Sequence, residues 1–244
     1  MTTPAHRIPA RERVIVALDV PDLSRLRELL DRLEGQPAFY KVGLELFVAE
    51  GERAVELVRQ RGGRLFLDLK LHDIPETVAR AVTAAARIEA DFLTVHTSGG
   101  FEMMRRAAEA AGGRPKILGV TVLTSLLEED LRADGIELSV AETVRARARV
   151  AARAGISGLV CSPQEIDAAR EASRDLLLVV PGIRPSGGEG AAYGDQKRVA
   201  TASQAIFHGA DYIVVGRPIR DASRPARAFA DLVDEVDAAA KPIT

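Results

Sequence analysis

Residues 65–78 read Leu-Phe-Leu-Asp-Leu-Lys-Leu-His-Asp-Ile-Pro-Glu-Thr-Val, and this stretch decides the predicted fold. Apolar residues alternate with Asp68 and Lys70, so a β-strand would place both charged groups on one face and the apolar residues on the other. A sheet face rarely holds a carboxylate and an ammonium side by side, because each group loses its hydration there. We therefore expect Asp68 and Lys70 to have a chemical role, with a structural ion pair as the alternative.

The same stretch continues into a predicted helix. Asp73 precedes Ile-Pro-Glu, which gives an N-cap aspartate, an early proline and a glutamate three residues after the cap. The pattern predicts a strand followed by a helix, which is one βα unit. Asp73 could serve only as the cap of that helix.

Short apolar runs alternate with stretches of helical period along the whole chain, as in repeated βα units with a parallel sheet. The predicted strands cover residues 13–19, 38–43, 64–70, 91–96, 116–123, 157–161, 176–180 and 211–215. The predicted helices cover residues 22–34, 46–61, 75–89, 101–112, 139–154, 163–172, 201–208 and 224–239. Eight such units in 244 residues predict an α/β fold, a (β/α)8 TIM barrel. We expect a single domain over residues 1–244, in which residues 1–11 form a polar N-terminal tail. An open doubly wound sheet is the alternative, but Gly-x-Gly-x-x-Gly is absent after the first strand.

Composition limits the possible partners and the compartment. A net charge of −2 provides no overall field to attract nucleic acid or an anionic membrane, so we expect neither as a partner. The 47% hydrophobic content with only 4% aromatic residues predicts a core of Val, Leu, Ile and Ala. Cys161 is the only cysteine, which excludes an intrachain disulfide and fits a reducing compartment. No segment approaches the ~18 apolar residues of a membrane span, so we expect a cytoplasmic protein.

Polar residues recur at the predicted carboxyl ends of the strands, where the active sites of such barrels lie. Asp19 ends the first strand, and Lys41 lies in the second among apolar neighbours. An ammonium there needs a carboxylate partner, and Asp68 on the adjacent strand is the expected one. Thr124 and Ser125 end the fifth strand, where their hydroxyls could bond a heterocyclic amide or simply start a short helix.

The last two strand ends predict a phosphate site. Arg184 follows the seventh strand and opens the glycine-rich loop 184–196, which we expect to be a mobile lid. Gly216 and Arg217 end the eighth strand, and the loops after strands seven and eight are the recurrent phosphate site of this fold. Together with Gln196, these residues favour phosphate recognition. Only one histidine, His96, ends a predicted strand, so we expect no His-rich metal site.

As a whole, Asp-x-Lys-x-x-Asp-Ile-Pro-x-Thr resembles the signature of the orotidine 5′-phosphate decarboxylase family. The resemblance extends over nearly the whole chain, and several separate motifs in order are more specific than one. The other matching motifs are Val16-Ala17-Leu18-Asp19, Tyr40-Lys41-Val42-Gly43, Pro181-Gly182-Ile183-Arg184-Pro185, Gly194-Asp195-Gln196 and Val215-Gly216-Arg217-Pro218.

The resemblance implies the decarboxylation of orotidine 5′-phosphate to UMP, the last step of de novo pyrimidine biosynthesis, without a cofactor or a metal. It implies that Asp19 and Lys41 contact the ribose hydroxyls and that Asp68 and Lys70 flank the reacting carbon. On chemical grounds we expect Lys70 to stabilise the charge that develops at C6 and to protonate this atom. Lys41 and Asp73 would keep Asp68 ionised and Lys70 oriented.

The remaining implied roles concern the periphery of the site. Asp73 and Thr77 would reach into the partner subunit's site, which makes a homodimer part of the catalytic unit. Thr124 and Ser125 would face the pyrimidine. The phosphate would be held by Arg184, Gln196, Gly216 and Arg217.

Two other readings of the sequence remain open. A metal-dependent sugar-phosphate enzyme such as hexulose-phosphate synthase shares the Asp-x-Lys-x-x-Asp core, but these relatives bind Mg2+ through a carboxylate where this chain has Lys41, and a lysine would repel the ion. A non-catalytic nucleotide-binding barrel is the other alternative, because a fold alone does not determine function.

Overall fold

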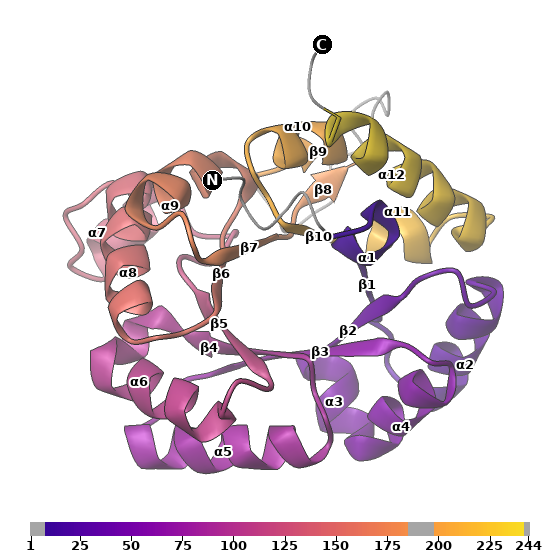
Figure 1. Ribbon diagram of the computed structural model, residues 1–244, viewed down its shortest axis with the longest axis horizontal. Coiled ribbons are helices and arrows are strands. Elements are labelled where there is room, and N and C mark those ends of the chain that lie inside the picture. The colour runs from indigo at the N-terminus through magenta and orange to yellow at the C-terminus, as the bar shows by residue number, and fades with distance from the viewer. Residues whose placement is uncertain (1–7, 185–197, 242–244) are drawn as a thin grey trace.

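The computed structural model describes residues 8–184 and 198–241, and within them eight parallel strands close into a barrel surrounded by helices (Figure 1). The first strand, β1 (Val14–Ala17), pairs with β10 (Tyr212–Val215) on one side and with β2 (Phe39–Gly43) on the other. The predicted (β/α)8 barrel is therefore confirmed, and the open-sheet alternative is wrong because this sheet has no free edge. The other strands of the barrel are β3 (Arg64–Leu71), β4 (Phe92–His96), β5 (Lys116–Val120), β6 (Gly158–Val160) and β7 (Leu177–Val180).

Helices cover the outside of the barrel close to where the sequence predicts them (Figure 1). The predicted helix 46–61 is two helices, because Gly51 between them adopts a positive φ of 56°. The predicted helix 163–172 begins as a 3-10 turn, η3 (Pro163–Glu165). The main helices are α2 (Leu23–Arg32), α3 (Leu44–Glu50), α4 (Glu52–Gln60), α5 (Pro75–Arg87), α6 (Gly100–Ala111), α8 (Val140–Arg153), α9 (Ile166–Ala172), α10 (Ala202–Phe207) and α12 (Pro225–Ala239).

Several short elements were not predicted, because they are too short to show a hydrophobic period. They include a small parallel sheet next to the barrel, in which Ile183 pairs with Ala200. These elements are α1 (Ala10–Arg13), η2 (Thr97–Gly99), α7 (Glu128–Ala133), α11 (Arg217–Arg220), β8 (Ile183–Arg184) and β9 (Ala200–Thr201).

Part of the predicted N-terminal tail belongs to the barrel. Residues 10 and 11 lie in α1, whose last residue, Arg13, is buried. The Arg13 guanidinium donates to the carbonyl oxygens of Ala210 at 2.7 Å and Asp211 at 3.0 Å, just before β10. These bonds fix the start of β1 against the end of the barrel at which its strands begin. Residues 1–7 lie outside the described part of the chain.

The barrel has two apolar regions with different compositions. Between strands and helices the core consists mainly of aliphatic residues, as predicted. Inside the barrel the core is mixed, because the aromatic rings of Phe39, Phe66, Phe92 and Tyr212, which the composition did not predict there, pack together among aliphatic residues. Phe39 and Phe92 have ring centroids 4.9 Å apart, and Phe92 and Tyr212 pack edge to face at 5.2 Å. The chain has few aromatic residues, and these four fill the narrow interior of the barrel below the strand ends.

Candidate active site

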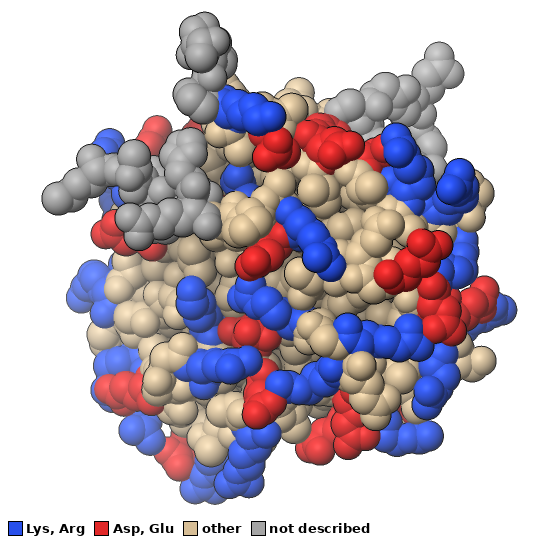
Figure 2. All heavy atoms as spheres, turned by 45° about the vertical axis from the view of Figure 1, so that its right-hand side comes forward, with Lys and Arg blue, Asp and Glu red and all other residues tan. Residues whose placement is uncertain are grey.

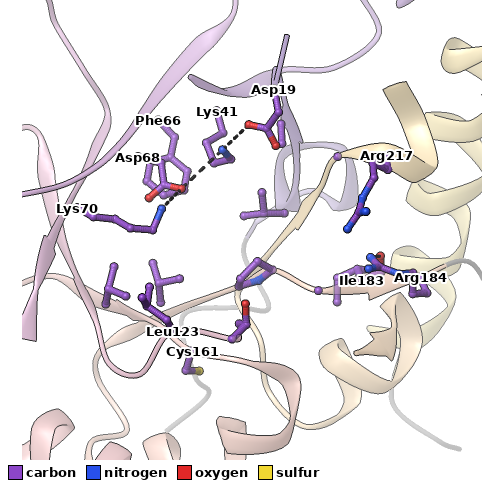
Figure 3. A pocket seen from close by; sticks show the side chains of 18 of the residues that line it. Asp19, Lys41, Phe66, Asp68, Lys70, Leu123, Cys161, Ile183, Arg184 and Arg217 are labelled. Carbon is purple, nitrogen blue, oxygen red and sulfur yellow. Dashed lines mark hydrogen bonds and ion pairs between the residues drawn. The ribbon is translucent and has the colours of Figure 1, made fainter. Parts of the chain in front are cut away.

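A cavity of about 400 Å3 opens at the carboxyl ends of the barrel strands (Figure 3). Phe66, from the aromatic layer inside the barrel, is among the residues that line it. The remaining lining residues come from most of the strand ends and the loops that follow them. They are Ala17, Asp19, Lys41, Asp68, Lys70, Val120, Val122, Leu123, Thr124, Val160, Cys161, Pro181, Gly182, Ile183, Arg184, Val214, Gly216, Arg217 and Arg220.

Four charged side chains from three adjacent strand ends form a continuous array along one wall of this cavity (Figure 3). Lys41 Nζ lies 2.9 Å from Asp19 Oδ1 and 3.6 Å from Asp68 Oδ2. Lys70 Nζ lies 2.8 Å from the same Oδ2 of Asp68. The sequence correctly paired Lys41 with Asp68, but Asp19 is the nearer carboxylate. Acidic and basic groups thus alternate in the order Asp19, Lys41, Asp68, Lys70.

The array keeps its buried members charged. Burial by itself would lower the pKa of Lys41, but the charges of Asp68 and Asp19 outweigh it, so the pKa of Lys41 lies above its usual value. Burial would raise the pKa of Asp68, yet the charges of Lys41 and Lys70 and the hydrogen bonds to this carboxylate hold its pKa below the usual range. A buried ammonium and a buried carboxylate therefore both remain ionised at neutral pH.

Strand β3 is irregular where it carries the array. Its register with β4 pairs Leu67 with Leu93 but Leu71 with Val95, so more residues of β3 than of β4 lie between these pairs. Such a bulge bends a strand and redirects its side chains. Lys70 lies within it and has a φ of 49°, which is unusual for a residue other than glycine. Alternation in a regular strand predicted that Asp68 and Lys70 share a face. In the structure their charged groups do meet, but in a strand that bulges at these residues.

The opposite side of the cavity is basic. Arg184 on β8 and Arg217 at the start of α11 lie across the cavity from Lys70 (Figure 3). They come from the loops after β7 and β10, as the sequence predicted. The cavity thus has a zwitterionic wall at one side and two guanidinium groups at the other, a polarity that suits an elongated ligand with an anionic end.

The family model described as "Orotidine 5'-phosphate decarboxylase / HUMPS family" matches residues 12–232 of this chain. The chain belongs to the orotidine 5′-phosphate decarboxylase / HUMPS family.

Relatives within the family are similar along almost their full length. The orotidine 5′-phosphate decarboxylase of Moorella thermoacetica is 46% identical over 241 residues, which cover 95% of this chain and 94% of the relative. That of Bradyrhizobium diazoefficiens is 48% identical over 233 residues, which cover 95% of both chains. A crystal structure of orotidine 5′-phosphate decarboxylase from Lactobacillus acidophilus has a TM-score of 0.81 at 37% identity and covers 93% of this chain and 99% of that chain.

Not all residues that the family signature contributes lie at this cavity. Thr124 lines the cavity, whereas Ser125 is exposed and does not. Asp73 and Thr77 are also exposed, and neither lines the cavity. Asp73 is not the N-cap of α5, because Ile74 occupies that position, although Asp73 Oδ1 accepts a hydrogen bond from the Ile74 amide at 2.6 Å. Gln196 and the rest of the predicted lid after Arg184 lie outside the described residues.

Sequence reasoning missed three residues that shape this family member's site. Thr94 hydrogen-bonds to Asp68, and the alternation Phe92, Thr94 along β4 could have indicated that it faces inward. Arg220 lines the cavity and donates to the carbonyl oxygen of Asp19 at 2.7 Å, a contact that no local pattern reveals. Cys161 ends the predicted strand 157–161, but it lies just after β6 in the structure, where it is buried and lines the cavity. Burial raises the pKa of its thiol to about 12, so it is a poor nucleophile at neutral pH.

Among residues 8–184 and 198–241, no group of three or more His, Cys, Asp and Glu side chains is arranged to hold a metal ion. None of the helices in these residues qualifies as a membrane-spanning segment.

Proposed function

We propose that this protein decarboxylates orotidine 5′-phosphate to UMP, the last step of de novo pyrimidine biosynthesis, and that its own side chains carry the reaction without a cofactor. The observation that carries the proposal is the Asp19, Lys41, Asp68, Lys70 array, with 2.8–3.6 Å between successive groups, on one wall of the cavity. Membership of the family and the full-length similarity to proteins named orotidine 5′-phosphate decarboxylase support the same activity.

The chemistry that this array offers is charge stabilisation and proton transfer. The bond between C6 of the pyrimidine and its carboxylate breaks, CO2 leaves, and the electron pair stays on C6. The Lys70 ammonium stabilises this developing negative charge and donates a proton to C6, which forms UMP. Lys70 is then neutral and takes up a proton from water. No electrons are gained or lost overall, so the step balances without a redox partner.

Asp68 has two roles in this proposal. It holds Lys70 Nζ at 2.8 Å and so orients the proton donor. Its depressed pKa also keeps a negative charge beside the carboxylate of the substrate. The repulsion between these two carboxylates ends when CO2 departs, which favours the transition state over the bound substrate.

The positions proposed for the rest of the nucleotide follow from the resemblance to the family, and the residues that line the cavity support them. Asp19 and Lys41, at the other end of the array, contact the ribose hydroxyls. Thr124 faces the pyrimidine, and Arg184 and Arg217 hold the phosphate through charge-assisted hydrogen bonds. Gly216 and Gln196 complete the phosphate site by resemblance to the family signature. Binding energy at the phosphate end thereby supports the chemical step at C6.

We also propose that the catalytic unit is a homodimer in which Asp73 and Thr77 contribute to the partner subunit's site. Both residues are exposed at the end of β3 and the start of α5, so they are available to another subunit. Exposed apolar side chains in the segments that follow the adjacent strands β2 and β3 support a protein interface, since Val48 in α3 is 80% and Ile74 is 67% exposed. Ser125, the exposed neighbour of Thr124, is assigned to the pyrimidine by resemblance to the family alone.

The ligand we propose is a small nucleotide rather than nucleic acid. Figure 2 shows basic and acidic side chains interspersed over one face of the molecule, without a broad area of a single sign. With a net charge of −2, this distribution offers no extended track for a phosphate backbone. The cytoplasmic location stays a prediction from the sequence.

The metal-dependent alternative is disfavoured by the position of Lys41. Its ammonium already bridges Asp19 and Asp68, the carboxylates that a divalent cation would need, at 2.9 Å and 3.6 Å. A second cation in this position would be repelled. A non-catalytic binding barrel is disfavoured because a carboxylate held in its charged form beside an anionic ligand weakens binding.

One assay tests the proposed function. The purified protein is mixed with orotidine 5′-phosphate, and the loss of orotate absorbance is followed with and without a chelator. We expect turnover at the same rate in both. Absence of turnover would refute the proposal, and turnover that stops with chelator would refute a reaction carried by side chains without a metal ion.

A further inference from the structure

The hydroxyl of Thr94 links the Asp68 carboxylate to the backbone of Lys70, at one end of the array. Thr94 is fully buried on β4. Its Oγ1 donates to Asp68 Oδ1 at 3.0 Å and accepts from the backbone N–H of Lys70 at 2.8 Å. Both distances are normal for hydrogen bonds. One side chain therefore contacts the carboxylate and also the backbone of the residue that carries the ammonium.

The direction of these two hydrogen bonds is fixed by the groups involved. The Lys70 amide can only donate, so it occupies a lone pair of Oγ1. The ionised Asp68 carboxylate can only accept, so the hydroxyl proton must point toward it. The hydroxyl satisfies both neighbours at once, and an apolar side chain of the same shape would satisfy neither.

The Lys70 backbone needs such support because it lies in the left-handed region. Within the described residues, the other residues besides glycine with positive φ are Glu34 and Glu89, which follow the ends of α2 and α5. Left-handed residues are common just after helices but not within strands. A strained residue keeps its conformation only when its surroundings hold it there.

The bulge explains why a side chain provides this support. Between the pairs Leu67–Leu93 and Leu71–Val95 the regular ladder between β3 and β4 is interrupted. An extra residue in a bulge is left without its ladder partner. The Lys70 amide would therefore lack an acceptor on β4, and Thr94 Oγ1 serves as that acceptor.

We propose that Thr94 is a positioning residue for the decarboxylation, whose hydroxyl holds the Lys70 backbone in its left-handed conformation and fixes the Asp68 carboxylate, so that Lys70 Nζ is aimed at C6. This inference rests on the proposed function. Thr94 touches the catalytic residues rather than the substrate, so its removal should impair the chemical step more than binding.

The test compares two substitutions at Thr94 with a matched control. Thr94→Val keeps the shape and removes the hydroxyl, whereas Thr94→Ser keeps the hydroxyl and removes a methyl group. Thr97→Val is the control, because Thr97 is also a buried threonine, and its hydroxyl donates at 2.8 Å to the carbonyl oxygen of Val120 rather than to the array. Thr94→Ala gives the same comparison if the valine variant is recovered unfolded.

Two readouts are needed, one of which requires no substrate. Hydrogen exchange of the Lys70 amide, measured by NMR, should be at least about tenfold faster in Thr94→Val than in the wild type, because the amide has lost its acceptor. In the same variant kcat should fall about 10- to 100-fold, as expected when a reacting group is misplaced by a fraction of an ångström. KM for orotidine 5′-phosphate should stay within about twofold. Thr94→Ser and Thr97→Val should stay close to the wild type in all three quantities.

Three results would overturn the inference. They are a normal kcat in Thr94→Val, a loss in Thr94→Ser as large as in Thr94→Val, and an unchanged exchange rate of the Lys70 amide in Thr94→Val. The second would show that packing of the methyl group is what counts. Wild-type turnover is measured first. If it is absent, the proposed function is refuted, but the exchange rate of the Lys70 amide still tests the Thr94 hydrogen bond separately.

Discussion

The ammonium of Lys70 lies 2.8 Å from Asp68 Oδ2, and the two residues are separated by only one position in the same strand. In a regular strand they would share a face, but here the left-handed backbone of Lys70 in a bulge helps to bring the two groups together. Lys41 approaches the same oxygen at 3.6 Å. Asp68 is thus the common partner of two cations, and its charge holds the array together.

Replacement of Asp68 should therefore destabilise the fold. Asp68→Asn keeps the shape but leaves Lys41 and Lys70 facing each other without the carboxylate between them. We expect the free energy of unfolding to fall by about 3 kcal/mol, the lower end of the range for breaking a buried ion pair, because the Lys70 side chain is 29% exposed. Urea unfolding measures this. Asp31→Asn, which removes a surface pair with Arg61, is the control and should cost less than about 1 kcal/mol.

The contribution of Asp68 to stability should depend on pH. A carboxylate whose pKa is depressed in the folded state stabilises the protein above its unfolded pKa of about 3.9, and this stabilisation is lost as pH falls through the folded value. The pKa of Lys41 is raised in the folded state, so Lys41 stabilises the fold at every pH below its unfolded pKa. This stabilisation is lost only in strong alkali, as pH rises through the folded pKa. The difference in unfolding free energy between the wild type and Asp68→Asn should be constant from about pH 5 to 9 and narrow below about pH 4. A difference that widened in acid would contradict the assigned charge states.

Loss of Arg217 should weaken binding of the phosphate specifically. A charge-assisted hydrogen bond contributes about 1.5–3 kcal/mol, so Arg217→Ala should raise the Kd of UMP roughly 10- to 100-fold. The Kd of uridine, which has no phosphate, should not change. Titration calorimetry measures both, with Arg227→Ala as the control, because Arg227 pairs with Asp231 on the exposed face of α12. An unchanged Kd of UMP would place the phosphate elsewhere.

Two inactive variants should restore activity to each other if the site is shared between subunits. Lys70→Ala removes the proton donor from its own site, whereas Asp73→Asn removes a group from the partner's site. A mixed dimer then contains one site with both changes and one site with neither. Random mixing of equal amounts after refolding should recover about a quarter of the wild-type sites, as the symmetry of a dimer requires. If the mixture stayed inactive, Asp73 would act within its own subunit.

The barrel and the charged end of its site were predictable because the information is local. Each βα unit carries its own hydrophobic period, and Asp19, Lys41 and Asp68 stand out as charges at the ends of apolar runs. The parallel order of the strands then brings these ends together. Arg184 and Arg217 were found in the same way, because both directly follow apolar strands.

The parts that were not predictable depend on contacts between distant segments. Alternation along residues 65–71 does not show that β3 bulges against β4, since that depends on which residues of β4 lie opposite. Threonine is common in strands, so the sequence does not distinguish Thr94 from other threonines. Its role becomes visible only from its contacts with Asp68 and Lys70. The aromatic interior was also missed, because the four rings come from β2, β3, β4 and β10 and meet only when the barrel closes.

Whether Lys70 delivers the proton to C6 is tested by measuring the turnover of Lys70→Ala together with its affinity for UMP. We expect decarboxylation to fall by at least about four orders of magnitude, since both the proton donor and the charge facing C6 are gone. The Kd of UMP should change less than tenfold, because the arginines at the phosphate end remain in place. Near-normal turnover in Lys70→Ala would show that another group delivers the proton to C6.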